Sequence, residues 1–487
     1  MATRDFSKWS GHIGLDDGIH LSRVAVEAEI FQIEQIVTVF DLDVVKSDTV
    51  ISCDLRQLMK EAVAPLGNVP EEKKDYHPGA PITLPVVYGR TSILPDQTIG
   101  LNDCLGTVGE EEMLPLVIFK EPTPRRSQWP PAYSQKFQWL PCDVQFETDG
   151  STPVCRITSY ISNAHPVKYR ALYETVEKII ARAIPLWNRS LAECISNQVR
   201  VKYGSVEYDD TANPPPQWDP KMSRDNNEYR NDFVAQYGAW EDSRTLALPE
   251  PDKFTVPEQY PVDFRTQFGR HGPDYEGGSR HLEGQLNEHI CASAIYYFYS
   301  ENITESTLAF RQRAYPEGVN SVDYMQHRHE FLQDIFGFGS YVNGYHLTQV
   351  TQDLGSVVCR EGRLITFPNV LQHRIPPFSL EDRTKHGHHK ILGFFLVDPH
   401  VRIISAANVP PQREDWGIEK EELVARMLSE RLPQEICDMV AHARNLNPPM
   451  SMDEAMELRR ELMKEQSVQL ERQTEEFTTG FFPLCEH

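Results

Sequence analysis

Apolar residues recur every three or four positions in several stretches of the chain, which is the spacing of amphipathic helices. The longest of these stretches is 165–187. Its apolar face consists of Tyr169, Leu172, Val176, Ile179, Ile180, Ala183 and Ile184. We expect this helix to cover one face of a sheet, because such a stripe must be buried against another layer. Residues 55–66 show a shorter pattern of the same kind, which stops at Pro65 and Gly67.

A second pattern consists of short runs rich in β-branched and aromatic residues, which are typical of strands. Such runs cover 155–161, 290–299, 363–367 and 390–397. From about residue 280 to 400 they dominate, and a short helix is expected there over 324–336. The stretch 76–150 is rich in Pro and Gly, so we expect short strands or an irregular wrap.

Two polar stretches follow neither pattern. Residues 205–260 contain a Pro-Pro-Pro run and many Asp, Asn and Arg residues, which predicts a long loop, either a surface excursion or a lid over a site. Near the C-terminus, Ser451 and Glu454 form a capping box that starts a helix reaching about residue 475. Charged residues surround this helix on all sides, which is typical of a solvated surface element.

The composition limits the classes of partner and compartment. A hydrophobic content of 40% indicates a globular protein, and a formal charge of −23 argues against a nucleic-acid partner. No window approaches the roughly 18 apolar residues of a membrane span, and the first residues lack the apolar core of a signal peptide. The nine cysteines form no CxxC pair, which favours free thiols in a reducing compartment. We therefore expect a cytoplasmic protein with no membrane partner.

The candidate chemistry is carried by His281, Glu283 and His373. His281 and Glu283 lie on the same face if their segment is extended, because side chains alternate along a strand. The segment follows a Gly277-Gly278 turn, and His373 opens another strand ninety residues after Glu283. Two imidazoles and one carboxylate on one side of a metal are the facial triad of non-heme Fe(II) oxygenases.

Two other histidine clusters are alternatives. The run 326–330 contains His327 and His329, but on a helix these side chains point apart and no third ligand is evident, so a surface helix is expected. The run 386–389 contains three histidines and is a candidate for adventitious metal binding.

Longer phrases of the sequence resemble a known family. Residues 281–298 resemble the second and third core strands of Fe(II)/2-oxoglutarate dioxygenases of the prolyl-hydroxylase type, and 373–398 resemble their last two core strands. From about 138 to 410 the chain is similar to an uncharacterised fungal family related to those oxygenases. The likeness is carried by FQWLPCDVQF, GQLNEHICASAIYY, EGRLITFPNVLQHR and ILGFFLVDPHVRIISAANVPPQ.

The resemblance implies an α+β fold with a distorted double-stranded β-helix, a cupin-like jelly-roll, as its core. This core would span 138–410, including the helix 165–187 and the loop 205–260. It would lie between a mixed helical and irregular N-terminal extension, 1–137, and a helical C-terminal extension, 411–487.

The resemblance also implies a role for individual residues. His281, Glu283 and His373 would be the iron ligands, with Glu in place of the commoner Asp. Tyr297 falls where such enzymes hydrogen-bond the distal carboxylate of 2-oxoglutarate. At the position of the usual arginine anchor stands His389, a weaker carboxylate partner than a guanidinium. Three nearby cationic residues are further candidates for this anchor: Lys390, Arg383 and Arg374.

The implied activity is that of an oxygenase or oxidative cyclase that uses Fe(II), 2-oxoglutarate and dioxygen. The expected substrate is a small molecule, by family resemblance a free amino acid in fungal secondary metabolism. The glycine-rich, aromatic segment 336–345 suits a loop closing over a small molecule, but equally an ordinary surface connection. Its candidate substrate contacts are Phe338, Tyr341, Asn343 and Tyr345. Two other functions remain open: an inactive jelly-roll that serves in binding or assembly, and a metal-dependent oxidase or hydrolase that does not use 2-oxoglutarate.

Overall fold

The structure is a computed structural model, and it describes about two thirds of the chain. The described residues are 31–32, 35–40, 44–67, 85–88, 90–94, 99, 101, 133–149, 152–196, 205–210, 213–220, 227–247, 265–266, 278–314, 316–325, 328–338, 342, 347–413, 416, 433 and 450–484.

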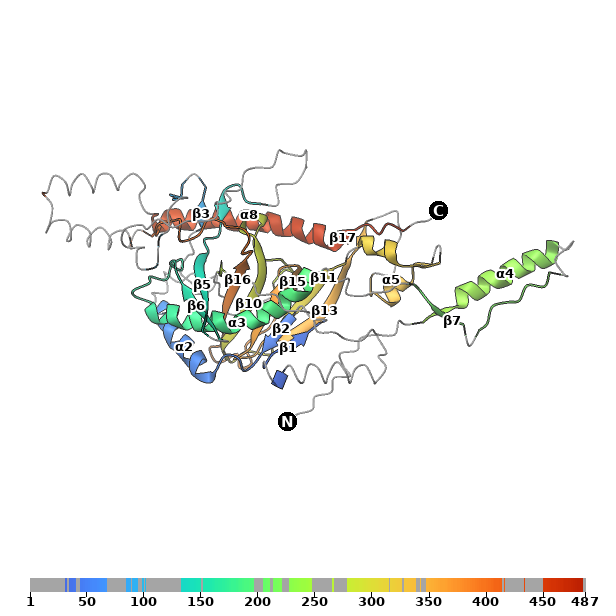
Figure 1. Cartoon of the computed structure of the whole chain (residues 1–487), viewed down its shortest axis with the longest axis horizontal. Helices are drawn as coiled ribbons and strands as arrows, with labels where there is room; N and C mark the ends of the chain where they lie inside the picture. Colours follow the sequence, from blue (N-terminus) through green and yellow to red (C-terminus); the bar gives the residue numbers. More distant parts are fainter. Residues whose placement is uncertain are drawn as a thin grey trace.

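The protein combines helices with several antiparallel sheets (Figure 1). The largest sheet has five strands in the order β1 (Val37–Val39), β2 (Val44–Ser47), β14 (Leu364–Pro368), β10 (Ile290–Glu301) and β16 (His388–Val397). A three-stranded sheet has the order β13 (Thr351–Val358), β11 (Thr307–Arg313) and β15 (Leu371–Arg374). Within the described residues these sheets do not close into a barrel.

Smaller elements complete the described fold. In a second three-stranded sheet, β5 (Cys142–Asp149) lies between β6 (Thr152–Ile157) and β9 (Arg265–Thr266). Three further sheets are pairs of two-residue strands: β3 (Val86–Val87) with β4 (Phe137–Gln138), β7 (Tyr208–Asp209) with β8 (Thr245–Leu246), and β12 (Thr348–Gln349) with β17 (Thr479–Gly480). The short helices are η3 (Leu286–Glu288), η4 (Pro316–Ser321) and α5 (Phe331–Asp334). The predicted strands near 290, 363 and 390 are confirmed as β10, β14 and β16.

β10 is buried on both faces, which explains why its sequence is apolar almost throughout. Side chains alternate along the strand, and the two sets enter different cores. Ala294 and Tyr296 join the cluster that includes the long helix α3 (Arg170–Ser196). Ile295 and Tyr297 join the cluster between the two larger sheets. We call this second cluster the inter-sheet core.

α3 and α2 (Cys53–Gly67) cover the outer face of the five-stranded sheet (Figure 1). The helix predicted over 165–187 is confirmed, but it begins later because residues 166–169 form a turn whose backbone N–H groups bond to the His165 ring. Its apolar stripe continues through Leu191, so the helix also ends later than expected. The side chain of Trp187 is fully buried at the contact, and its indole N–H donates to the Ser293 carbonyl at 3.1 Å.

The prediction of a continuous loop over 205–260 is wrong for α4 (Asn227–Ser243), which projects away from the body of the molecule (Figure 1). Aromatic residues line one face of this helix, and Trp218 packs against it. The ring centroids of Trp218 and Phe233 are 4.8 Å apart, and those of Tyr237 and Trp240 are 5.0 Å apart. The sequence concealed this helix because its apolar stripe is aromatic and lies among many charged residues.

α8 (Met452–Thr478) begins at the predicted N-cap, since the Ser451 side chain accepts a hydrogen bond from the Glu454 N–H. The Glu454 carboxylate forms an ion pair with Arg90. The expectation of a wholly solvated helix is wrong, because a narrow stripe with near seven-residue spacing is buried. This stripe consists of Ala455, Leu462, Gln469 and Phe477. In contrast, the helix predicted over 324–336 is reduced to the four residues of α5. Gly337, three residues after its end, adopts a left-handed conformation with φ of +71°.

Among the described helices, none combines the length and the apolar character needed to cross a bilayer. The cysteines described as free thiols are Cys53, Cys142, Cys155, Cys291 and Cys359.

The contact between α3 and the large sheet can be tested by replacing Trp187 with alanine. We expect Trp187→Ala to lower the free energy of unfolding by about 3–5 kcal/mol, since a large buried ring and its hydrogen bond are lost. Trp218→Ala is the matched control: its side chain, which packs against α4, is 43% exposed, and we expect a loss of about 1 kcal/mol or less. Urea unfolding followed by circular dichroism measures both. Equal losses in the two variants would contradict this packing.

Candidate metal centre

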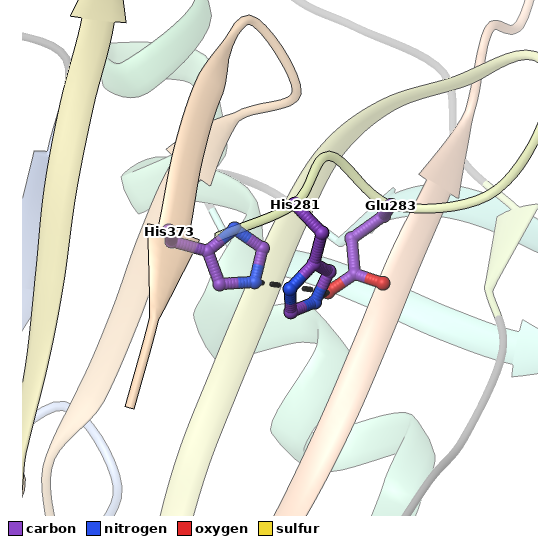
Figure 2. Close-up of side chains that lie close together, drawn as sticks. All are labelled: His281, Glu283 and His373. Carbon is purple, nitrogen blue, oxygen red and sulfur yellow. Dashed lines mark hydrogen bonds and ion pairs between the residues drawn. The ribbon is translucent and has the colours of Figure 1, made fainter. Parts of the chain in front are cut away.

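The candidate site is built at an antiparallel bridge between His281 and His373 (Figure 2). The two residues exchange backbone hydrogen bonds in both directions, with N–O distances of 3.1 Å. A pair of this kind places its side chains on the same face of the sheet. The strand β15 therefore fixes His373, and the segment ahead of η3 brings His281 and Glu283 to it.

Side-chain atoms of the three residues converge (Figure 2). Nε2 of His373 lies 3.1 Å from Oε1 of Glu283, and Nε2 of His281 lies 3.8 Å from the same oxygen. All three ligand atoms lie within 4.8 Å of one another. Two adjacent ligand atoms on a metal with bonds of about 2.1 Å are about 3 Å apart. The distance between Oε1 of Glu283 and Nε2 of His373 already has this value. Among the described residues this is the one group of three or more potential ligands that could hold a metal ion.

The environment favours the neutral, metal-binding form of His281. Its Nδ1 lies 2.9 Å from the carbonyl oxygen of Ser279, which can only accept, so Nδ1 carries the proton and Nε2 presents its lone pair. Burial lowers the pKa of His281, and the neighbouring His373 lowers it further, whereas Glu283 acts in the opposite direction. A neutral imidazole is the form that ligates metals.

The site lies at the boundary between the interior and the surface. The His373 side chain is 5% exposed, that of Glu283 17% and that of His281 36%. On the buried side, Phe367 packs against the His373 ring at a centroid distance of 4.7 Å. The side of the site formed by His281 is therefore the more exposed one.

The backbone of Glu283 is held by the side-chain amide of Asn369. The Glu283 N–H donates to Oδ1 of Asn369 at 2.8 Å, and Nδ2 of Asn369 donates to the Glu283 carbonyl at 2.9 Å. The same Nδ2 also donates to the Ile290 carbonyl at 3.0 Å. Asn369 lies in the turn between β14 and β15, so one amide ties the segment 281–285, which we call the metal segment, to the start of β10 and to the strand that carries His373.

A buried carboxylate supports the next residues of the metal segment. Glu288 accepts hydrogen bonds from the N–H groups of Gln285 and Trp139, both at 2.8 Å. Burial raises the pKa of Glu288 to about 7, and the nearby Glu283 and Glu465 contribute in the same direction. Gly284 has a φ of +67°, and a Cβ there would lie 2.4 Å from Oε2 of Glu288. The close approach of this carboxylate therefore requires glycine.

The inner face of β10 presents two buried hydroxyl groups to the inter-sheet core. Ser293 precedes Tyr297 by four residues and shares its face of the strand. Its hydroxyl has no hydrogen-bond partner among the described residues. The Tyr297 hydroxyl lies beside the thiol of Cys359, a weak partner, and burial raises the pKa of Tyr297 well above its ordinary value. Buried hydroxyls without a strong partner are costly unless a ligand or water satisfies them.

Comparison with known proteins identifies the family to which the chain belongs. The model of DUF4246, described as a protein of unknown function, matches residues 20–420, well over half of the chain. The chain belongs to this family. The search of curated proteins found no match. Among solved structures, a prolyl-4-hydroxylase from Pseudomonas putida is similar at 18% identity over 28% of this DUF4246 chain, with a TM-score of 0.15. The match spans 52% of that hydroxylase, so it covers about half of its length.

Of the four residues considered as a carboxylate anchor, His389 faces the inter-sheet core. Its ring lies 5.0 Å from that of Tyr297, and Nδ1 lies 3.2 Å from the Ser300 hydroxyl. Lys390 points to the other face, where its ammonium lies over the Tyr299 ring. Arg383 is exposed in a turn. Arg374 is also exposed, on the face of β15 opposite to His373.

The candidate substrate segment is only partly described. Tyr341, Asn343 and Tyr345 lie outside the described residues, and their predicted contact with substrate stays a prediction. The structure places Phe338 in the core, because its ring is 5% exposed and packs against Phe482 at 5.1 Å. His327 of the competing cluster also lies outside the described residues, while Glu330 is ion-paired with Arg328.

Three residues that contribute to the site were not anticipated from the sequence: Ser293, Asn369 and Glu288. Ser293 had a detectable signal, since it is the one serine in the apolar run 290–299. Asn369 had none, because its partners are backbone groups 79 and 86 residues away. Glu288 bonds locally to the Gln285 N–H, but its second partner, the Trp139 N–H, is 149 residues away.

The positioning role of Asn369 can be tested in the DUF4246 protein with Asn369→Asp. The variant loses both N–H donors and places a carboxylate against two carbonyl oxygens, so we expect about 10–100-fold weaker binding of Fe(II). Asn302→Asp is the matched control, because the Asn302 amide likewise donates to backbone carbonyls, those of Asp382 and Lys385. We expect Asn302→Asp to leave iron affinity unchanged in an anaerobic titration. Equal affinities in both variants would show that Asn369 does not position the ligands.

The buried Glu288 leads to a pH-dependent expectation for the metal-free protein. Its pKa of about 7 exceeds the unfolded value of 4.5, so the folded state holds the proton more tightly and loses relative stability as pH rises between these values. Glu288→Gln resembles the protonated acid. We expect its unfolding free energy to rise relative to wild type by about 3 kcal/mol between pH 4.5 and 7. Urea midpoints at several pH values measure the difference, and a constant difference across this range would contradict the elevated pKa.

Proposed function

We propose that this protein is a mononuclear Fe(II)- and 2-oxoglutarate-dependent oxygenase that acts on a small molecule. The observation that carries the proposal is the convergence of His281, Glu283 and His373 at the edge of the inter-sheet core. Two neutral imidazoles and a carboxylate are the donor set that non-heme Fe(II) oxygenases use. We further propose that the two larger sheets are the halves of a jelly-roll, with the inter-sheet core between them.

The inter-sheet core offers suitable groups for a 2-oxo acid, and its Phe367, which is opposite Ser293 in the sheet, packs against the His373 ring. Ser293 and Tyr297 present hydroxyls that lack strong partners, and His389 lies against the Tyr297 ring. A carboxylate buried there would accept hydrogen bonds from these groups. Arg363 adds a positive charge near Tyr297, although its own donors bond to Asp48 and to the Val358 carbonyl.

Each ligand has a distinct task in this proposal. His281 and His373 supply neutral lone pairs, and Glu283 supplies one negative charge, which offsets one of the two positive charges of a divalent cation. Bound together, Fe(II), 2-oxoglutarate and dioxygen would supply the oxidising power to remove hydrogen from a substrate. Asn369 and Glu288 hold the ligand segment in place, and Phe367 excludes water from the inner side of His373. The partly exposed side of His281 leaves access for a substrate.

An anaerobic titration with Fe(II) followed by 2-oxoglutarate tests the proposal. We expect a visible metal-to-ligand charge-transfer band in wild type and none in His281→Ala, which loses a ligand. Tyr297→Phe should keep the iron and weaken 2-oxoglutarate binding about tenfold, the effect of losing one hydrogen bond to a charged group. His400→Ala is the control, since its side chain is 89% exposed and lies on the turn after β16.

The other outcomes of this titration identify the alternatives. Iron binding without the band would contradict the role of 2-oxoglutarate and favour a metal-dependent oxidase or hydrolase. A wild type that binds no iron would leave a binding or assembly protein as the better account.

A further inference from the structure

Three arginines gather on the outer face of the three-stranded sheet. Arg280 and Arg374 are the chain neighbours of the bridged pair His281 and His373, so they leave the sheet on the opposite face from the histidines. Arg311 on β11 lies on the same outer face, because it is opposite Gln372 in the register of β11 and β15. We call Arg280, Arg311 and Arg374 the arginine cluster.

The arginine cluster has little negative charge to balance it in the described part of the chain. Arg280 forms an ion pair with Asp353 at 2.7 Å, and the Asp353 side chain is 70% exposed. Arg311 directs Nε and Nη2 to the amide oxygen of Gln372, which is neutral. Arg374 is exposed and makes no hydrogen bond or ion pair with any described residue. Three guanidinium groups thus share one carboxylate, in a protein whose formal charge is −23.

This arrangement is costly without a further anion. The three guanidinium groups are like charges gathered on one face of the sheet. Burial lowers the pKa of Arg311, and Arg280 and Arg374 contribute in the same direction. In addition, Nη1 of Arg280 is buried and has no hydrogen-bond partner among the described residues. A buried charged donor without an acceptor is destabilising, and a bound anion would relieve both effects.

The C-terminal end of α8 forms one side of this surface. The guanidinium of Arg311 lies 5.9 Å from the centre of the Phe477 ring, and the Thr474 hydroxyl donates to the Arg280 carbonyl at 3.4 Å. Arg280 and Arg311 are therefore held in place from the sheet and from the helix. Fixed guanidinium groups bind carboxylate and phosphate oxygens in a bidentate manner.

We propose that the arginine cluster is a binding site for a small oxyanion, a carboxylate or a phosphate group. It lies on the opposite face of the sheet from the metal ligands, so it is a second site and not part of the metal centre. A ligand there contacts residues directly adjacent in sequence to two of the metal ligands. The inference does not depend on the identity of the metal or on the use of 2-oxoglutarate.

Calorimetric titration of the full-length protein with inorganic phosphate and, separately, with acetate tests this site at constant ionic strength. We expect saturable binding of at least one anion, and the tighter of the two identifies the chemical class. Arg374→Gln should weaken binding about tenfold, the effect of one charge-assisted hydrogen bond. Asp353→Asn should strengthen binding, because it removes the carboxylate that competes with the ligand.

Arg383→Gln is the matched control, since Arg383 is an exposed arginine outside the cluster and the substitution removes the same charge. We expect it to leave anion binding unchanged. The proposal is overturned if neither anion binds saturably, or if Arg383→Gln weakens binding as much as Arg374→Gln does. Unchanged or weaker binding in Asp353→Asn would also contradict it.

Discussion

The candidate site depends on one backbone interaction, the antiparallel bridge between His281 and His373. Its two hydrogen bonds bring together segments that are about ninety residues apart in the chain. Directly opposed residues share a face of the sheet, and their chain neighbours point to the other face. The same bridge therefore places the metal-ligand candidates on one face and the neighbouring arginines on the other. The histidines face Glu283 and the inter-sheet core, whereas their neighbours Arg280 and Arg374 face outward. A shift of register by one residue would exchange these sides.

Several parts of this arrangement could be predicted from the sequence. The spacing of His281 and Glu283 required only that their segment be roughly extended, and their side chains do converge with His373. Strand alternation placed His389 and Lys390 on opposite faces, as their contacts with Tyr297 and Tyr299 show. These predictions succeeded because they depend on local geometry with a fixed period.

Other parts could not be predicted, since they depend on contacts between distant segments. The amide of Asn369 finds its partners at Glu283 and Ile290, and no local pattern encodes such a match. The helix α4 was missed because a stripe of aromatic residues, and not an aliphatic one, supports it. Arg374 was considered for the inner face on the basis of its nearness in sequence to His373. The register of β15 with β11 places it outside.

The central claim is that His281, Glu283 and His373 bind one Fe(II) ion together. X-ray absorption spectroscopy of the iron-loaded, anaerobic protein tests it most directly, because imidazole rings give characteristic outer-shell scattering. We expect one iron per chain in a shell of nitrogen and oxygen donors, with the outer-shell signal of two imidazoles. His373→Ala should remove one of the two. A wild-type spectrum with no imidazole contribution, or one that His373→Ala leaves unchanged, would contradict the claim.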